Sequence, residues 1–192
     1  SGYQWFDLTN DNVDYILEQS LKGENILNKF IKEVKERFNL QNNQICLSGF
    51  SQGCMMSINV GLTAEEPFSC IVGFSGKIID TKNLKMRRKN FTNTLLVHGD
   101  QDDIVSPTHL LEAKDFLLRE NVDIETHLIK NCSHHIPIEA SSIALNYILK
   151  IRKKNSTDTL LIHGDQDEIV SPTYLLEAKD FLLRENVIIE TN

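Results

Sequence analysis

The stretch Gly49–Gly53, with the sequence Gly-Phe-Ser-Gln-Gly, constrains the fold of this 192-residue chain more than any other. A short apolar run, Gln44–Leu47, comes before it, and Met55–Val60 after it can continue as a helix. The two glycines around Ser51 favour a sharp strand-to-helix turn that leaves no room for side chains at their positions. Such a turn holds a serine hydroxyl out over a sheet. A tight turn without any chemical role is the alternative, and five residues alone do not decide between the two.

Short apolar runs alternate with helical periodicity along most of the chain. Apolar residues recur at three- and four-residue steps from Glu24 to Asn39, which predicts an amphipathic helix. The polar, basic segment 75–90 is expected to be a surface loop with solvated charges. Strands alternating with helices predict βαβ units and an α/β fold with a mostly parallel sheet. Further strands are predicted at 69–74, 94–97 and 122–129, and further helices after Gly53, at 107–121 and at 138–151.

The chain then repeats itself. Residues 84–127 and 149–192 align without gaps at an offset of 65 residues, with mild exchanges such as Val97 for Ile162. We interpret this as a partial duplication of one strand-loop-helix-strand unit, so that 1–152 is a partial domain and 153–192 a partial duplicate of the unit around 88–127. The second apolar run, residues 159–162, has two alternatives: it pairs with an exposed sheet edge, or it competes with 94–97 for one position in the sheet.

Composition excludes several classes of protein. The net charge of −7 and the absence of a basic block interleaved with aromatic residues argue against nucleic-acid binding. Apolar runs are far shorter than a membrane span, and no signal peptide pattern opens the chain, so a cytoplasmic protein is expected. The four scattered cysteines form no Cys-x-x-Cys pair and are expected to be free thiols. One of them, Cys54, is expected to be a small core residue.

An acid and a histidine follow Ser51 in the chain. A serine hydroxyl needs a neighbouring base to take its proton, imidazole suits that role, and a carboxylate orients the imidazole. The loop after strand 94–97 contains three aspartates, and the loop after strand 122–129 contains two histidines; spacing alone does not choose among them. The candidates are Asp100, Asp102 and Asp103, and His134 and His135.

Four motifs over residues 3–152 together resemble the phospholipase/carboxylesterase family, which includes acyl-protein thioesterases. They are Trp5-Phe6-Asp7, Gly49-Phe50-Ser51-Gln52-Gly53, His98-Gly99-Asp100-Gln101-Asp102 with Val105, and Ser133-His134-His135-Ile136. The resemblance implies an α/β-hydrolase fold and hydrolysis of carboxylic esters or thioesters, with no metal and no cofactor. Substrates of this kind are small acyl esters, lysophospholipids and acyl thioesters.

The resemblance also assigns roles to residues. It implies Ser51 as the nucleophile, Asp102 as the triad acid, His134 as the base and the backbone N–H of Gln52 as one oxyanion donor. His98, His109 and His127 are interpreted as structural or exposed. Two positions depart from the family pattern without touching the proton-transfer groups: Cys54 stands where the family usually has glycine, and Ser106 separates Val105 from the following proline.

The resemblance also predicts that some parts of the family fold are missing from this chain. Only 48 residues precede Gly49, and they contain neither a clear pair of strands nor the Leu-His-Gly loop that supplies the second oxyanion donor. We therefore expect an α/β-hydrolase sheet lacking its first strands, with an exposed edge through which copies of the chain can associate. The alternative to an active hydrolase is an inactive remnant, or a fragment that binds a partner without catalysis.

Overall fold

The computed structural model describes residues 4–7, 12–155, 160–163 and 188–191. Strands and helices alternate along the chain, as the sequence pattern predicts. The elements are α1 (Val13–Phe38), the short 3-10 helix η1 (Asn42–Gln44), β1 (Ile45–Phe50), α2 (Gln52–Thr63), β2 (Cys70–Phe74), α3 (Thr81–Arg87), β3 (Thr94–Gly99), α4 (Thr108–Arg119), β4 (Ile124–Ile129), α5 (Ile138–Asn155), β5 (Leu160–His163) and β6 (Ile188–Thr191).

Within the described residues, six parallel strands form one sheet in the order β4-β3-β2-β1-β5-β6. This confirms the α/β fold with a parallel sheet. Strands β1, β2 and β3 are buried along almost their whole length, as expected for a parallel sheet covered on both faces. Because parallel strands end at the same edge, the loops that follow β1, β2, β3 and β4 share one edge of the sheet.

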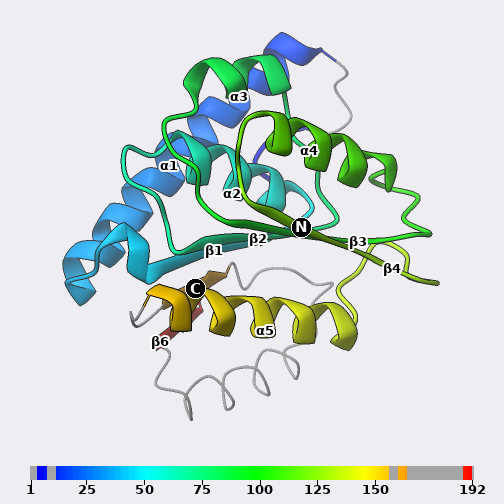
Figure 1. Ribbon diagram of the computed structural model, residues 1–192. Helices are drawn as coiled ribbons and strands as arrows, with labels where there is room; N and C mark the ends of the chain where they lie inside the picture. The colour runs from blue at the N-terminus through cyan, green and yellow to red at the C-terminus, as the bar shows by residue number, and fades with distance from the viewer. Residues whose placement is uncertain (1–3, 8–11, 156–159, 164–187, 192) are drawn as a thin grey trace.

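Helices cover both faces of the sheet (Figure 1). Helices α2 and α4 pack on one face through residues such as Ile58 and Leu117, and α5 packs on the other through residues such as Tyr147 and Ile148. Helix α1 packs beside α2 on the first face, where Ile31 belongs to a buried cluster with Leu47 of β1 and Val60 of α2. This layering leaves the carboxyl edge of the strands to the loops that contain the candidate catalytic residues.

Strand β5, from the second copy of the repeat, pairs with β1. Its register joins Ile45 to Leu160 and Leu47 to Ile162, so this strand takes the first of the two alternatives and covers the edge of β1 that was expected to be exposed. Strands β5 and β6 are parallel neighbours, as the corresponding strands β3 and β4 are. The duplicate acid, Asp167, lies outside the described residues.

Two details differ from the sequence predictions. The first helix begins at Val13, well before Glu24, because the Asn12 side chain caps it by accepting the N–H of Tyr15 at 3.2 Å. Segment 75–90 is not a loop with solvated charges, since it contains α3. Four of its basic side chains form ion pairs with distant acids: Arg87 with Glu24, Lys85 and Arg88 with Glu120, and Lys89 with Glu65.

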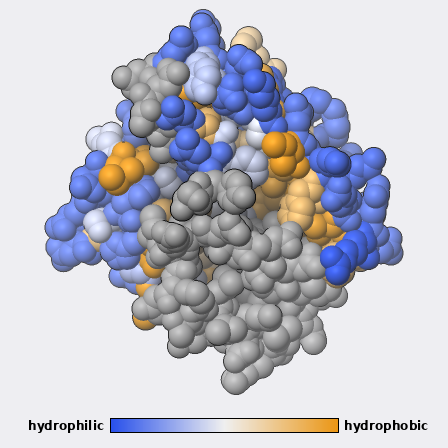
Figure 2. All heavy atoms as spheres, turned by 180° about the vertical axis from the view of Figure 1, so that it is seen from behind, coloured by the Kyte–Doolittle hydropathy of each residue, from blue (hydrophilic) through white to orange (hydrophobic). Residues whose placement is uncertain are grey.

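The described surface is largely hydrophilic on the face that Figure 2 shows, with hydrophobic residues in a few separate groups. Ion pairs one helical turn apart, such as Lys22 with Glu18, contribute to this character along α1. None of the helices in the described part of the chain is long and apolar enough to cross a membrane.

Candidate active site

Ser51 forms the turn between β1 and α2 by itself. Its φ of 52° and ψ of −114° lie outside the regions that residues with side chains prefer, a conformation that costs roughly 1–3 kcal/mol. Two hydrogen bonds hold it there: its N–H donates to Phe74 O at 2.8 Å, and its carbonyl accepts the N–H of Met55 at 3.2 Å. The strand-to-helix turn that the sequence predicts is therefore present, with the serine at its strained position.

The two glycines around Ser51 have different reasons for being glycine. A Cβ at Gly49 would lie 2.1 Å from the carbonyl carbon of Gly53, so no side chain fits there. A Cβ at Gly53 would meet nothing within 4 Å. The expectation that both positions exclude side chains is thus wrong for Gly53. The backbone carbonyl of Gly53 lies against Gly49, whereas the position of a Cβ on Gly53 is open space.

Cys54 is a buried core residue, as expected, and it fills space that glycines leave open. A Cβ at Gly73 or Gly76 would lie 2.3 Å or 2.5 Å from Cys54 Sγ, respectively. Burial raises the pKa of the Cys54 thiol to about 12, which keeps it neutral. All four cysteines are free and buried, which confirms the prediction of free thiols.

Asp102 follows β3, and its carboxylate is buried in a set of hydrogen bonds. Its Oδ1 accepts the N–H groups of Ile104 at 3.0 Å and Val105 at 2.9 Å, and its Oδ2 accepts Nδ1–H of His134 at 2.8 Å. Burial by itself raises the pKa of this carboxyl. The hydrogen bonds from Val105, His134 and Ile104 outweigh burial, so the pKa of Asp102 is lowered and the group is ionised near neutral pH.

Asp102 is buried, unlike the two neighbouring aspartates. Asp100 is exposed and accepts the N–H of Cys132 at 3.4 Å, while Asp103 is exposed. Of the two adjacent histidines, His134 contacts Asp102, whereas His135 is exposed and lies 3.1 Å from Ser133 Oγ. The structure thus brings together one aspartate and one histidine of the five candidates.

His134 also lies beside the strand that leads into Ser51. Its ring centroid is 4.6 Å from that of Phe50, the residue before Ser51, at an interplanar angle of 47°. Because Nδ1 donates to Asp102, Nε2 of the neutral ring is the nitrogen that can accept a proton. Among the described residues, no hydrogen bond joins Ser51 Oγ to His134.

Gln52, the first residue of α2, has a role in its side chain that the sequence analysis missed. Its Oε1 accepts the N–H of Trp5 at 2.8 Å, and its Nε2 donates to Phe6 O at 2.7 Å. The amide therefore ties the segment around Trp5 to the turn at Ser51. The Gln52 backbone N–H has no acceptor within α2, because it lies in the first helical turn.

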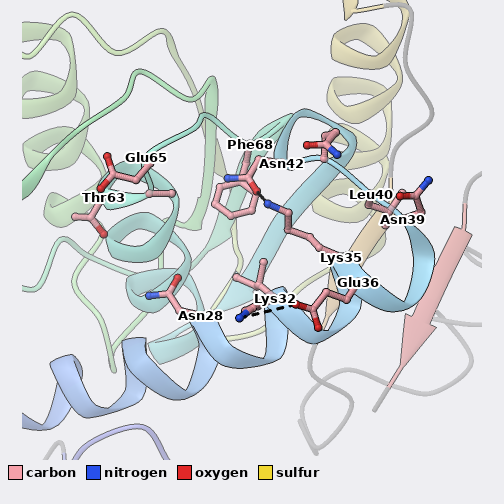
Figure 3. A pocket seen from close by; sticks show the side chains of 13 residues that line it. Asn28, Lys32, Lys35, Glu36, Asn39, Leu40, Asn42, Thr63, Glu65 and Phe68 are labelled. Atoms are coloured by element: carbon pink, nitrogen blue, oxygen red, sulfur yellow. Dashed lines mark hydrogen bonds and ion pairs between the residues drawn. The ribbon is translucent and has the colours of Figure 1, made fainter.

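A separate pocket of about 610 Å³ lies at the amino end of β1 (Figure 3). In Figure 3, the Lys35 amine points toward Asn42 and Lys32 pairs with Glu36. Ser51 follows the opposite, carboxyl end of β1, so this pocket is not part of the site around Ser51. Its lining comes from α1, η1 and the segment after α2, including Ile31, Leu40, Ala64 and Phe68.

Within the part of the chain that the structure describes, no group of three or more His, Cys, Asp and Glu side chains is placed to hold a metal ion.

Comparison with sequence models of protein families matches residues 1–152 to the phospholipase/carboxylesterase family. The chain belongs to this family. Similar members are acyl-protein thioesterase 1 of Yarrowia lipolytica, 30% identical over 155 residues, and esterase YpfH of Escherichia coli, 25% identical over 171 residues. These alignments cover 75% and 85% of this chain, and 66% and 69% of the two relatives.

A solved esterase structure shares the fold. The crystal structure of esterase PE8 matches with a TM-score of 0.74 and 30% identity, and the match covers 78% of this chain and 71% of that chain. The family resemblance inferred from the four motifs is thereby confirmed, together with the α/β-hydrolase fold.

Proposed function

We propose that this chain hydrolyses carboxylic esters or thioesters through an acyl intermediate on Ser51. The observation that carries the proposal is the Asp102–His134 hydrogen bond of 2.8 Å, with the His134 ring packed against Phe50 at the start of the strained turn. Names of similar proteins support the substrate class, since they include an acyl-protein thioesterase and esterases.

The chemistry follows from the roles of these groups. His134 Nε2 takes the proton of Ser51 Oγ as the oxygen attacks the carbonyl carbon, and the ionised Asp102 stabilises the imidazolium that forms. The protonated His134 then gives this proton to the leaving alcohol or thiol. Water attacks the acyl-Ser51 ester in the second half, with His134 again acting as base, and the acid product leaves.

The tetrahedral intermediate also needs hydrogen-bond donors. The backbone N–H of Gln52 follows the nucleophile directly and points from the first turn of α2, where the helix dipole favours negative charge. We assign it as one oxyanion donor. The Gln52 side chain is itself held by its two hydrogen bonds to the Trp5 N–H and the Phe6 carbonyl, which we call the Gln52 clamp. This clamp limits movement of the Gln52 backbone N–H.

Turnover of p-nitrophenyl esters and of an acyl thioester tests the proposal. Wild type is expected to hydrolyse at least one of them, and Ser51→Ala is expected to lower kcat/KM by more than about 10⁴-fold. Ser106→Ala is the matched control, because Ser106 is exposed and its hydroxyl contacts only Thr108 among the described residues. Failure of folded wild type to turn over any of these substrates would instead favour the inactive or partner-binding alternative.

A further inference from the structure

His98 lies on β3, and its side chain is buried with 1% of its surface exposed. It lies against the segment 100–105, which contains Asp102 and is called the acid loop below. Its Nε2 is 2.8 Å from Val105 O and 3.2 Å from Asp102 Oδ2. A carbonyl oxygen only accepts hydrogen bonds, so Nε2 must be the nitrogen that carries the hydrogen. The N–H is therefore directed at the loop backbone, and the Asp102 carboxylate lies beside the same nitrogen.

The contact with His98 completes the surroundings of the Asp102 carboxylate. An ionised carboxylate has about four lone-pair sites. Two N–H groups occupy Oδ1, those of Ile104 and Val105, and two histidine nitrogens face Oδ2, those of His134 and His98. With three hydrogen bonds to it and the His98 ring against Oδ2, the carboxylate has little freedom to rotate away from His134.

We propose that His98 is a positioning residue: its Nε2–H holds Val105 O, and its ring lies against Asp102, so that Oδ2 faces Nδ1 of His134. The proposal rests on the proposed function, because it takes Asp102 and His134 as the acid and base. His98 acts through Asp102 and touches neither the nucleophile nor the reacting carbonyl. It also donates to Val105 O, and Val105 N–H donates to Asp102, so the acid loop is closed on itself.

A neutral donor suits this position. Burial lowers the pKa of His98, and the nearby His134 and His109 lower it further, against the raising effects of Val105 and Asp102. The ring is therefore uncharged near neutral pH. A neutral ring beside the carboxylate does not cancel its charge, so Asp102 keeps the charge that stabilises the His134 imidazolium.

Two amide substitutions test the role. His98→Gln places its amide nitrogen near the position of Nε2, whereas His98→Asn reaches only the position of Nδ1. We expect His98→Asn to lower kcat by about tenfold to a hundredfold, because the buried Val105 carbonyl loses its donor and the loop that holds Asp102 shifts, with KM nearly unchanged. His98→Gln is expected to stay within about threefold of wild type. His127→Gln is the control, because His127 pairs with Glu125 and not with the triad.

A second measurement does not depend on turnover. Nitrogen NMR of the wild-type imidazoles is expected to show His98 as the neutral Nε2–H form at pH 7. The downfield proton of His134 Nδ1–H is expected to persist in His98→Gln and to weaken in His98→Asn. If wild type hydrolyses nothing, the proposed function fails while this measurement still decides the role of His98.

Several outcomes would overturn the inference. The neutral Nδ1–H form of His98 would remove the donor on which the inference rests, and a charged His98 would contradict the neutral donor. Equal kcat values for wild type and His98→Asn, or equal losses in the Asn and Gln variants, would show that the nitrogen position has no effect on the acid. A lower melting temperature in both variants with unchanged kcat would mean that His98 only stabilises the fold.

Discussion

The imidazole of His134 packs on the ring of Phe50, with centroids 4.6 Å apart, although the two residues come from different strand ends. Phe50 is the last residue of β1, and Ser51 follows it. The contact places the base beside the turn that presents the nucleophile, and Asp102 accepts the Nδ1–H of the same ring. Position and tautomer of His134 thus depend on two separate neighbours.

The first prediction concerns the Phe50 ring. Phe50→Leu is expected to lower kcat roughly threefold to tenfold, because the imidazole loses the surface that aligns it. It is also expected to lower the free energy of unfolding by about 1–2 kcal/mol. Phe74→Leu is the control: Phe74 pairs with Phe50 across the strands and is buried in the same cluster. A similar loss of stability with unchanged kcat is expected there, and equal kcat losses would contradict the prediction.

The second prediction separates Asp102 from its neighbour Asp103. Asp102→Asn is expected to lower kcat by about 10⁴-fold, since an amide favours the wrong tautomer of His134. Asp103→Asn, at an exposed neighbouring position, is expected to stay within about twofold of wild type. Steady-state kinetics on one ester measures both. A large loss in Asp103→Asn with a small one in Asp102→Asn would reverse the assignment of the acid.

The third prediction concerns stability below neutral pH. The pKa of His98 in the folded chain lies below its ordinary value of 6.5. Below pH 6.5 the unfolded chain therefore binds a proton at His98 that the folded chain does not, and the free energy of unfolding falls with falling pH. His98→Gln is expected to reduce this slope between pH 7 and pH 5. Urea unfolding measures it, and an unchanged slope would show that burial does not hold His98 neutral.

Asp102 does not interfere in this range. The pKa of its carboxyl is lowered from 3.8 in the folded chain, so the group is ionised in both states above pH 5. Its own contribution to stability is present above pH 3.8 and is lost only as the pH falls through the lowered value. The difference between the pH slopes of wild type and His98→Gln therefore measures the contribution of His98 to the free energy of unfolding.

The fourth prediction concerns the Gln52 clamp. Gln52→Ala leaves the Trp5 N–H and the Phe6 carbonyl without their partners, which is expected to cost about 1–3 kcal/mol of unfolding free energy. Gln101→Ala, at an exposed glutamine, is expected to change it by less than about 0.5 kcal/mol. Urea unfolding of the three proteins checks this, and equal stabilities would mean that the clamp is not part of the folded structure in solution.

Much of the fold could be predicted from local patterns. Apolar runs ending in glycine and polar residues marked β1 and β3, and the loops after them contain Ser51 and Asp102. The order of serine, acid and histidine followed from the chain itself. Choosing Asp102 from three aspartates needed the family resemblance. Asp102 differs from the other two because it is buried among N–H donors, and one of these, His134, is distant in the chain.

Other features depend on partners that are distant in the chain. Helix α3 and its basic residues looked like a solvated loop because Glu24 and Glu120, the acids that pair with them, lie far away in sequence. The position of β5 beside β1 could not be chosen, since its sequence nearly repeats that of β3 and suits either position. His98 looked like any buried or exposed histidine, because the two contacts that distinguish it exist only in the folded acid loop.

Covalent labelling of Ser51 tests the central claim most directly. A fluorophosphonate probe reacts with a serine that a neighbouring base has activated. We expect it to label the wild-type chain on Ser51, as located by mass spectrometry of the digested adduct, to label Ser106→Ala equally, and not to label Ser51→Ala. Labelling that persists in Ser51→Ala, or that maps to another residue, would contradict the assignment of Ser51 as the nucleophile.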